Sequence, residues 1–156
     1  MLNGGYIESS NGYAGDTLTL EVGHTLKGYG YLGGGYYGYN ATNIVNNGTI
    51  LADNTSGNVL YFYGPSLNNS AGLIQVADGA NFYVGSGTIT GGTVQGFGTG
   101  TIGGGGNFAN LLIKGGLNLT GSSFTDVTFE DTNTVTGQVA IGGTLTNNGT
   151  LALNGG

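Results

Sequence analysis

The acidic residues that lie closest together in the chain are Asp126, Glu130 and Asp131. They belong to the segment 124–131, Phe-Thr-Asp-Val-Thr-Phe-Glu-Asp, in which apolar and polar residues alternate. This alternation predicts a β-strand that turns Val127 and Phe129 inward and Asp126 and Glu130 outward. Carboxylates on an outer face predict a solvated strand surface. A weak Ca²⁺ site is the alternative, because carboxylate oxygens are the ligands that Ca²⁺ prefers.

The same carboxylates are poorly spaced for catalysis. Two residues four positions apart on a strand lie about 13 Å from each other. This is too far for the carboxylate pair of a retaining or an inverting glycosidase, unless a neighbouring coil of the chain supplies one of the two groups. Parallel β-helix lyases and hydrolases also usually bind acidic sugars with Arg or Lys. The chain has no Arg, and neither Lys27 nor Lys114 lies in this segment. We therefore expect no enzyme activity; a polysaccharide lyase using Asp126, Glu130 and Asp131 is the alternative.

Other residues that could bind a metal or a cofactor lack the partners they would need. His24 is the only histidine and there is no Cys, so a zinc site has too few ligands, and His24 is expected in a turn or on the surface. The glycine runs 33–35 and 103–106 are not followed by Gly-Lys-Ser/Thr, so they are not phosphate-binding loops. They predict tight corners instead. No cofactor is expected.

Tyrosine is the residue type that most strongly indicates an interaction surface. All ten tyrosines lie within residues 1–83, and five of them fall within 28–40, where they alternate with glycine. Such a segment predicts a flat, amphipathic patch whose side chains lose little conformational entropy when they make a contact. It could cap or pack the first coil, contact another protein, or stack on carbohydrate. The candidate interaction residues are Tyr6, Tyr13, Tyr29, Tyr31, Tyr36, Tyr37 and Tyr39, together with Leu151 and Leu153 near the C-terminus.

The composition excludes several classes of partner. With two Lys, no Arg and a net charge of −6, the chain cannot neutralise a run of phosphates, so neither nucleic acid nor an anionic membrane surface is a partner. Its apolar runs are far shorter than the ~20 residues of a membrane-spanning helix. No signal peptide opens the sequence, so we expect a piece of a larger secreted protein or a chain whose signal was removed.

The elements that must position these residues are short β-strands. The chain has 36 Gly and few strong helix formers, and segments such as 17–22 alternate between apolar and polar residues. One proline argues against collagen. Residues 43–65 resemble 66–88 at an offset of 23, and Ile-Val-Asn-Asn-Gly-Thr-Ile at 44–50 recurs as Leu-Thr-Asn-Asn-Gly-Thr-Leu at 145–151.

These repeats predict an all-β parallel β-solenoid, a single domain over residues 1–156. Coils of about 20–24 residues would give roughly seven turns with Gly- and Asn-rich corners. The alternative is an antiparallel sandwich with Asn-Gly hairpins. The offset of 23 predicts that Ile50 lies against Leu73, and Val59 against Phe82, with all four side chains inward. Asn46 and Asn69 would share a corner, where Asn residues of successive coils can form hydrogen-bonded ladders.

Two segments resemble the repeats of large bacterial surface proteins. They are 145–156, Leu-Thr-Asn-Asn-Gly-Thr-Leu-Ala-Leu-Asn-Gly-Gly, and 85–94, Gly-Ser-Gly-Thr-Ile-Thr-Gly-Gly-Thr-Val. Both look like autotransporter passengers and filamentous-haemagglutinin-like β-solenoids. The resemblance implies a right-handed parallel β-helix, export to the bacterial cell surface, and a role as adhesin, stalk or matrix protein. The Tyr-rich segment 28–40 and the lack of an export domain depart from that pattern.

The sequence therefore favours a structural extracellular protein. Leu-Asn-Gly-Gly occurs at both 2–5 and 153–156, as though one unit followed another in register. We expect copies of the chain to join end to end into a fibre, with Tyr6, Tyr13 and the 28–40 segment near the junction. The alternatives are covalent continuation into a longer repeat array, and an adhesin module whose Tyr-rich face binds a surface glycan or receptor.

Overall fold

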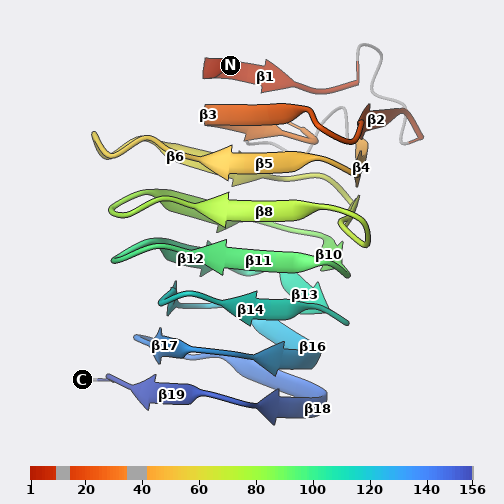
Figure 1. Ribbon diagram of the computed structural model, residues 1–156. Coiled ribbons are helices and arrows are strands. Elements are labelled where there is room, and N and C mark those ends of the chain that lie inside the picture. The colour runs from red at the N-terminus through yellow and green to blue at the C-terminus, as the bar shows by residue number, and fades with distance from the viewer. Residues whose placement is uncertain (10–14, 35–41, 156) are drawn as a thin grey trace.

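The protein is a parallel β-solenoid in which nineteen strands wind through about six turns (Figure 1). The computed structural model describes residues 1–9, 15–34 and 42–155, so Tyr13, Tyr36, Tyr37 and Tyr39 lie outside the described residues. The eighteen strand pairings described are all parallel, and no helix occurs in these three ranges, hence none that could cross a membrane. The predicted fold class is confirmed, with about six turns where roughly seven were expected.

The strands stack into three sheet faces that run along the solenoid axis. Face 1 contains β2 (Thr17–Leu20), β4 (Asn43–Asn46), β7 (Ser66–Asn68), β10 (Thr88–Thr90), β13 (Asn107–Ala109) and the first parts of β16 (Ser123–Phe129) and β18 (Ala140–Asn147). Face 2 contains the first half of β3 (Thr25–Leu32), β5 (Thr49–Ala52), β8 (Leu73–Val76), β11 (Thr93–Gly96), β14 (Leu112–Lys114) and the second parts of β16 and β18.

Face 3 holds the strands that carry most of the described tyrosines. It contains β1 (Leu2–Ile7), the second half of β3, β6 (Val59–Phe62), β9 (Asn81–Val84), β12 (Thr101–Gly104), β15 (Asn118–Leu119), β17 (Thr132–Val135) and β19 (Thr150–Leu153). The strand β1 lies at one end of the stack and β19 at the other, so the two termini are at opposite ends of the solenoid (Figure 1).

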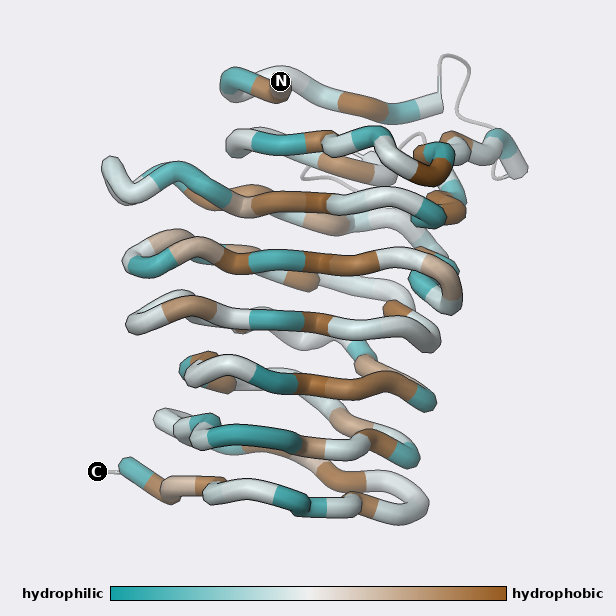
Figure 2. The backbone as a smooth tube through the Cα atoms, in the orientation of Figure 1, coloured by the Kyte–Doolittle hydropathy of each residue, from teal (hydrophilic) through white to brown (hydrophobic). Residues whose placement is uncertain are grey.

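Three columns of apolar side chains, one behind each face, form the main part of the core. Because side chains alternate along a strand, an aligned strand in the next coil places its own inward residue directly beneath. The columns are Ile44, Leu67, Ile89, Phe108 and Phe124 on face 1; Ile50, Ile74, Val94, Ile113 and Phe129 on face 2; and Leu60, Phe82, Ile102, Leu119 and Val135 on face 3. Apolar segments accordingly recur at matching places on successive coils (Figure 2).

The predicted register is correct on face 1 and wrong by one residue on the other two faces. Ile44 pairs with Leu67, 23 residues later, as expected. Ile50, however, pairs with Ile74, so Leu73 is half-buried and does not lie beneath Ile50. Phe82 lies beneath Leu60, and Val59 is half-buried as well. The one-residue differences arise at the corners, whose lengths differ between the two coils.

Corner lengths account for both errors. Two residues separate β4 from β5, but four separate β7 from β8, whereas six separate β5 from β6 and four separate β8 from β9. The buried Asn46 and Asn69 side chains mark the first of these corners. The Nδ2 of Asn46 donates to Oδ1 of Asn69 at 2.7 Å and to the Leu73 carbonyl at 3.2 Å. The expected asparagine ladder is therefore present between these two coils.

Candidate functional site: a tyrosine ladder and an open terminal coil

Four tyrosines form a ladder on the outer surface of face 3. The strand register aligns Tyr6 with Tyr31, Tyr31 with Tyr61, and Tyr61 with Tyr83. We call these four residues the tyrosine ladder. Neighbouring parallel strands lie about 4.8 Å apart, close to the stacking distance of two aromatic rings, so identical outward residues in register bring their rings together.

The ring geometry is tightest at the N-terminal end of the ladder. The centroids of Tyr6 and Tyr31 are 4.7 Å apart with an interplanar angle of 4°, and those of Tyr31 and Tyr61 are 4.8 Å apart at 10°. Tyr83 turns its edge to Tyr61, at 5.5 Å and 61°. The next aligned position is Gly103, where the ladder stops for lack of a side chain.

Tyr63 extends the aromatic surface sideways. Its ring centroid lies 6.1 Å from that of Tyr31, 5.8 Å from Tyr61 and 6.2 Å from Tyr83. It lies against Gly85 of the next coil, where any Cβ atom would collide with the ring. Glycine is therefore required at position 85 for the ring to pack there.

Sequence reasoning identified only part of this surface. Tyr6 and Tyr31 were among the candidates and lie in the ladder, and Tyr29 lies beside it, over Gly4. Tyr61, Tyr63 and Tyr83 were not recognised, because an offset of 23 aligns Tyr61 with Val84. The actual interval here is 22, which aligns Tyr61 with Tyr83 and would have revealed the ladder.

A shallow groove of about 300 Å³ follows one side of the ladder. It is lined by Gly4, Tyr29, Gly30, Tyr31, Gly57, Asn58, Val59 and Tyr61. The phenol groups of its tyrosines and the amide of Asn58 supply side-chain polar atoms. No lining residue has a charged side chain, so the groove suits a neutral ligand better than an ionic one.

The acidic residues 126, 130 and 131 do not converge on a common point. Val127 and Phe129 are buried, as predicted, but Asp126 sits at a bulge in β16 with φ of 52°. One of its oxygens, Oδ1, accepts the Thr144 backbone N–H at 2.8 Å. Among residues 1–9, 15–34 and 42–155, no group of three Asp, Glu or His side chains could hold a metal ion.

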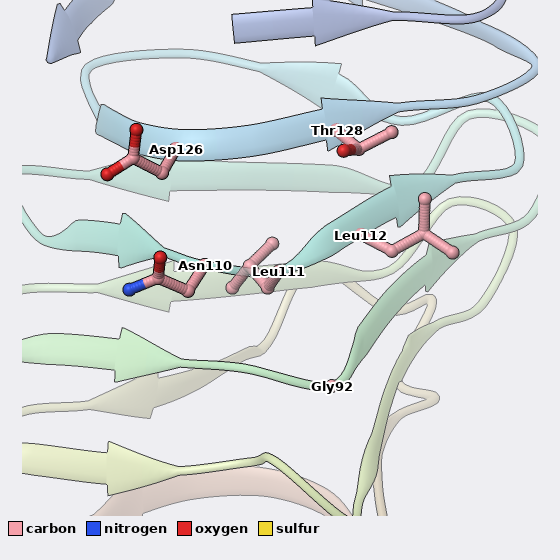
Figure 3. A pocket seen from close by; sticks show the side chains of 6 residues that line it. All are labelled: Gly92, Asn110, Leu111, Leu112, Asp126 and Thr128. Carbon is pink, nitrogen blue, oxygen red and sulfur yellow. The ribbon is translucent and has the colours of Figure 1, made fainter. Parts of the chain in front are cut away.

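Asp126 also lines another groove, of about 510 Å³, with Gly92, Asn110, Leu111, Leu112 and Thr128 (Figure 3). This groove follows the corner between faces 1 and 2. Asn110 and Asp126 both have left-handed backbone conformations there, with φ of 53° and 52°. Asn and Asp are the non-glycine residues that adopt this conformation most readily. Asp126 is the only ionisable residue in the lining, so the groove offers no acid–base pair.

His24 lies exposed in the turn after β2, where its backbone N–H donates to the Glu21 carbonyl at 3.1 Å. This is the turn or surface position predicted from the sequence. Lys27 forms a 3.6 Å ion pair with Asp53, an exposed contact that contributes little to stability.

The C-terminal coil leaves part of the core uncovered. Within the described part of the chain, β18 and β19 have ladder partners on one side only, β16 and β17. Ile141 is 56% exposed and Leu153 is 80% exposed, whereas Phe124 and Val135, which they align with in the preceding coil, are buried. Leu145 and Leu151 are half-buried. We call Ile141, Leu145, Leu151 and Leu153 the terminal apolar surface.

No family model, no curated protein and no solved structure matches the chain.

Proposed function

We propose that the protein is a structural element of a bacterial extracellular assembly, in which the C-terminal coil of one copy stacks on the N-terminal coil of the next. The terminal apolar surface is the observation that carries this proposal. An exposed apolar surface bordered by unpaired strand edges is costly in water and favours addition of another coil, whether that coil belongs to a second copy or to a continuation of the same chain. The proposal assigns no catalytic role to the acidic residues.

The interior of the solenoid supplies the pattern for such a contact. Every coil already joins the next through parallel backbone hydrogen bonds and aligned apolar columns. At the opposite end of the molecule, Leu18, Leu20 and Leu26 are half-buried on the inward side of β2 and β3. Stacking the C-terminal coil on this end would extend the existing core. Because two different surfaces meet, the contact is heterologous and propagates into a filament.

Sedimentation of the purified chain at tens of micromolar tests the proposal. We expect concentration-dependent assemblies, visible as fibres by electron microscopy. Ile141→Asp and Leu153→Asp place carboxylates on the terminal apolar surface and should abolish assembly. Phe97→Asp is the matched control: Phe97 is 44% exposed but lies on the side of the solenoid, between β11 and β12. A monomer at all concentrations would overturn the proposal.

The groove beside the tyrosine ladder favours a second candidate function, an adhesin module for a neutral surface glycan. Its support is the combination of three tyrosines, an asparagine amide and no charge in one lining. Titration calorimetry against a panel of neutral and uronate oligosaccharides tests it. Binding of a neutral glycan that is lost in Asn58→Ala but kept in Asn107→Ala, an exposed position on face 1, would support the groove. Absence of binding across the panel would reject it.

A further inference from the structure

The N-terminal end of the tyrosine ladder brings together two phenols from different coils. Tyr6 lies on β1 and Tyr31 on β3, and their backbone positions pair directly. We propose that this pair is an oxidative cross-linking site, at which a peroxidase using hydrogen peroxide couples the two side chains into dityrosine. This inference does not depend on end-to-end assembly or on glycan binding.

The chemistry requires only two phenols and a two-electron oxidant. Each phenol loses one electron and one proton to become a phenoxyl radical, whose unpaired spin lies partly on the ring carbons ortho to the oxygen. Two such carbons join in a new C–C bond, and each then releases its proton, which restores both hydroxyl groups. Hydrogen peroxide accepts the two electrons and two protons and becomes two molecules of water.

The geometry favours coupling of this pair over coupling between molecules. The two rings are 4.7 Å apart and nearly parallel, so the reacting carbons are held close together before oxidation begins. Holding two reactants in this way is equivalent to a very high local concentration. The in-register backbones of β1 and β3 maintain the alignment.

The solvent exposure of Tyr6 and the lack of competing Cys and Trp side chains also direct oxidation to the ladder. Tyr6 is 58% exposed, so an oxidant can reach its ring edge from solvent. Successive rings at 4.7, 4.8 and 5.5 Å allow the radical to move along the ladder to Tyr31 and beyond. The chain has no Cys and no Trp that would compete as oxidation targets.

A bond between these side chains would fasten the outermost described strand to the solenoid. Within the described residues β1 pairs only with β3, and its far edge is unpaired. The cross-link would close a loop from residue 6 to residue 31 and prevent fraying of β1. A structural protein in an oxidising exterior would gain resistance to unfolding from that end.

Trypsin provides a direct readout, because Lys27 and Lys114 are the only cleavage sites. The monomer is treated with peroxidase and hydrogen peroxide at low micromolar concentration, denatured and digested. We expect peptide 1–27 joined to peptide 28–114, lighter than their sum by two hydrogen atoms, with dityrosine fluorescence. Fragmentation should locate the bond at Tyr6 and Tyr31. Treatment of the unfolded chain in denaturant should lower the yield at least tenfold.

Conservative variants separate this pair from the other tyrosines. Tyr6→Phe and Tyr31→Phe keep a ring in the stack but remove the phenol, and each should abolish the joined peptide. Tyr13→Phe is the matched control, since Tyr13 is the other tyrosine of peptide 1–27. The proposal is overturned if the joined peptide persists in Tyr6→Phe or Tyr31→Phe, if it disappears in Tyr13→Phe, or if the only dityrosine formed links separate chains.

Discussion

At the scale of single residues, position relative to the core decides what a side chain contributes. Ile50 and Leu73 are both β-strand residues with large apolar side chains, yet Ile50 is completely buried and Leu73 is half-buried. Full burial of such a side chain is worth roughly 1.5–3 kcal/mol, and a polar replacement there has no partner. Substitutions at Ile50 and Leu73 should therefore change the free energy of unfolding by different amounts.

Replacing Ile50 with Asp should destabilise the protein by several kcal/mol, because it places an unpaired carboxylate between Leu26 and Ile74 in the face 2 column. Leu73→Asp is the matched control and should cost much less, since its side chain reaches solvent. Urea denaturation of both variants measures the difference. Equal losses would contradict the register described above.

Asp78 should make the stability depend on acidity. The backbone N–H and the hydroxyl of Thr99, in the next coil, donate to its Oδ1 at 2.7 and 2.9 Å, and these hydrogen bonds hold the pKa of Asp78 below its ordinary value of 3.8. A lowered folded-state pKa stabilises the fold above the unfolded pKa, and that contribution is lost as the pH falls through the folded value.

The melting temperature of the wild type should therefore fall more steeply below about pH 4 than that of Asp78→Asn. Thr99→Val removes the hydroxyl donor but keeps the backbone N–H, so its acid dependence should be intermediate. Thermal melts at pH 7, 5, 4 and 3 provide the measurement. Parallel curves for wild type and Asp78→Asn would show that these hydrogen bonds do not influence the titration.

At the scale of elements, corners decide how neighbouring coils fit. The interval between aligned face 1 residues falls from 23, between Ile44 and Leu67, to 16, between Phe108 and Phe124. Part of this shortening occurs at the corner between faces 2 and 3, which has six residues between β5 and β6 but three between β14 and β15. The rest comes from the strands themselves, since β13, β14 and β15 are each shorter than β4, β5 and β6.

The corner turn of Asn46 has a near copy at Asn147, which allows a matched test. The Oδ1 of Asn46 accepts the Gly48 N–H at 3.1 Å, and the Oδ1 of Asn147 accepts the Gly149 N–H at 3.4 Å. Asn46 is buried and also bonds the next coil, whereas Asn147 is exposed. Asn46→Ala leaves buried polar groups without partners and should cost about 1–3 kcal/mol.

In contrast, Asn147→Ala should change the free energy of unfolding by less than about 0.5 kcal/mol, the usual range for surface substitutions. Chemical denaturation of the two variants under identical conditions gives both numbers. If the two substitutions were equally costly, the local turn rather than the contact between coils would be the stabilising feature.

At the scale of the whole molecule, the protein is a solenoid with few charged side chains. It has two Lys and eight acidic residues, and none of the ten lies within residues 132–155, which include the C-terminal coil. Contacts at that end must rest on apolar area and backbone hydrogen bonds. The terminal apolar surface and the tyrosine ladder lie at different places, so assembly and oxidation can be tested separately.

Assemblies of the protein should therefore resist salt. Raising NaCl from about 0.05 to about 1 M shortens the Debye length from about 14 to about 3 Å and removes most interactions between exposed charges. We expect the sedimentation profile to stay the same or to shift toward larger species. Dissociation of the assemblies by salt would mean that charge pairs hold the copies together.

The amino-acid sequence by itself determined the class of the fold. Alternation within short segments identified strands, and the inward orientation of Val127 and Phe129 followed from it, because side-chain direction within one strand is a local property. Asparagine and glycine marked the corners for the same local reason. The sequence also predicted the pairing of Asn46 with Asn69, since no insertion separates these two residues from the aligned residues of face 1.

Only the tertiary structure decided which residues meet across coils. Corner lengths differ from coil to coil, so the sequence interval between aligned residues changes along the chain, and a single offset of 23 is wrong by one residue on faces 2 and 3. An error of one residue exchanges the inward and outward residues of a strand. This is why Ile50 met Ile74 and why Tyr83 joined Tyr61. The repeated segments 44–50 and 145–151 likewise occupy different corners, the first between faces 1 and 2 and the second between faces 2 and 3. Their local turns are alike because hydrogen bonding within a turn is local, but stacking depends on the lengths of all the corners that precede them.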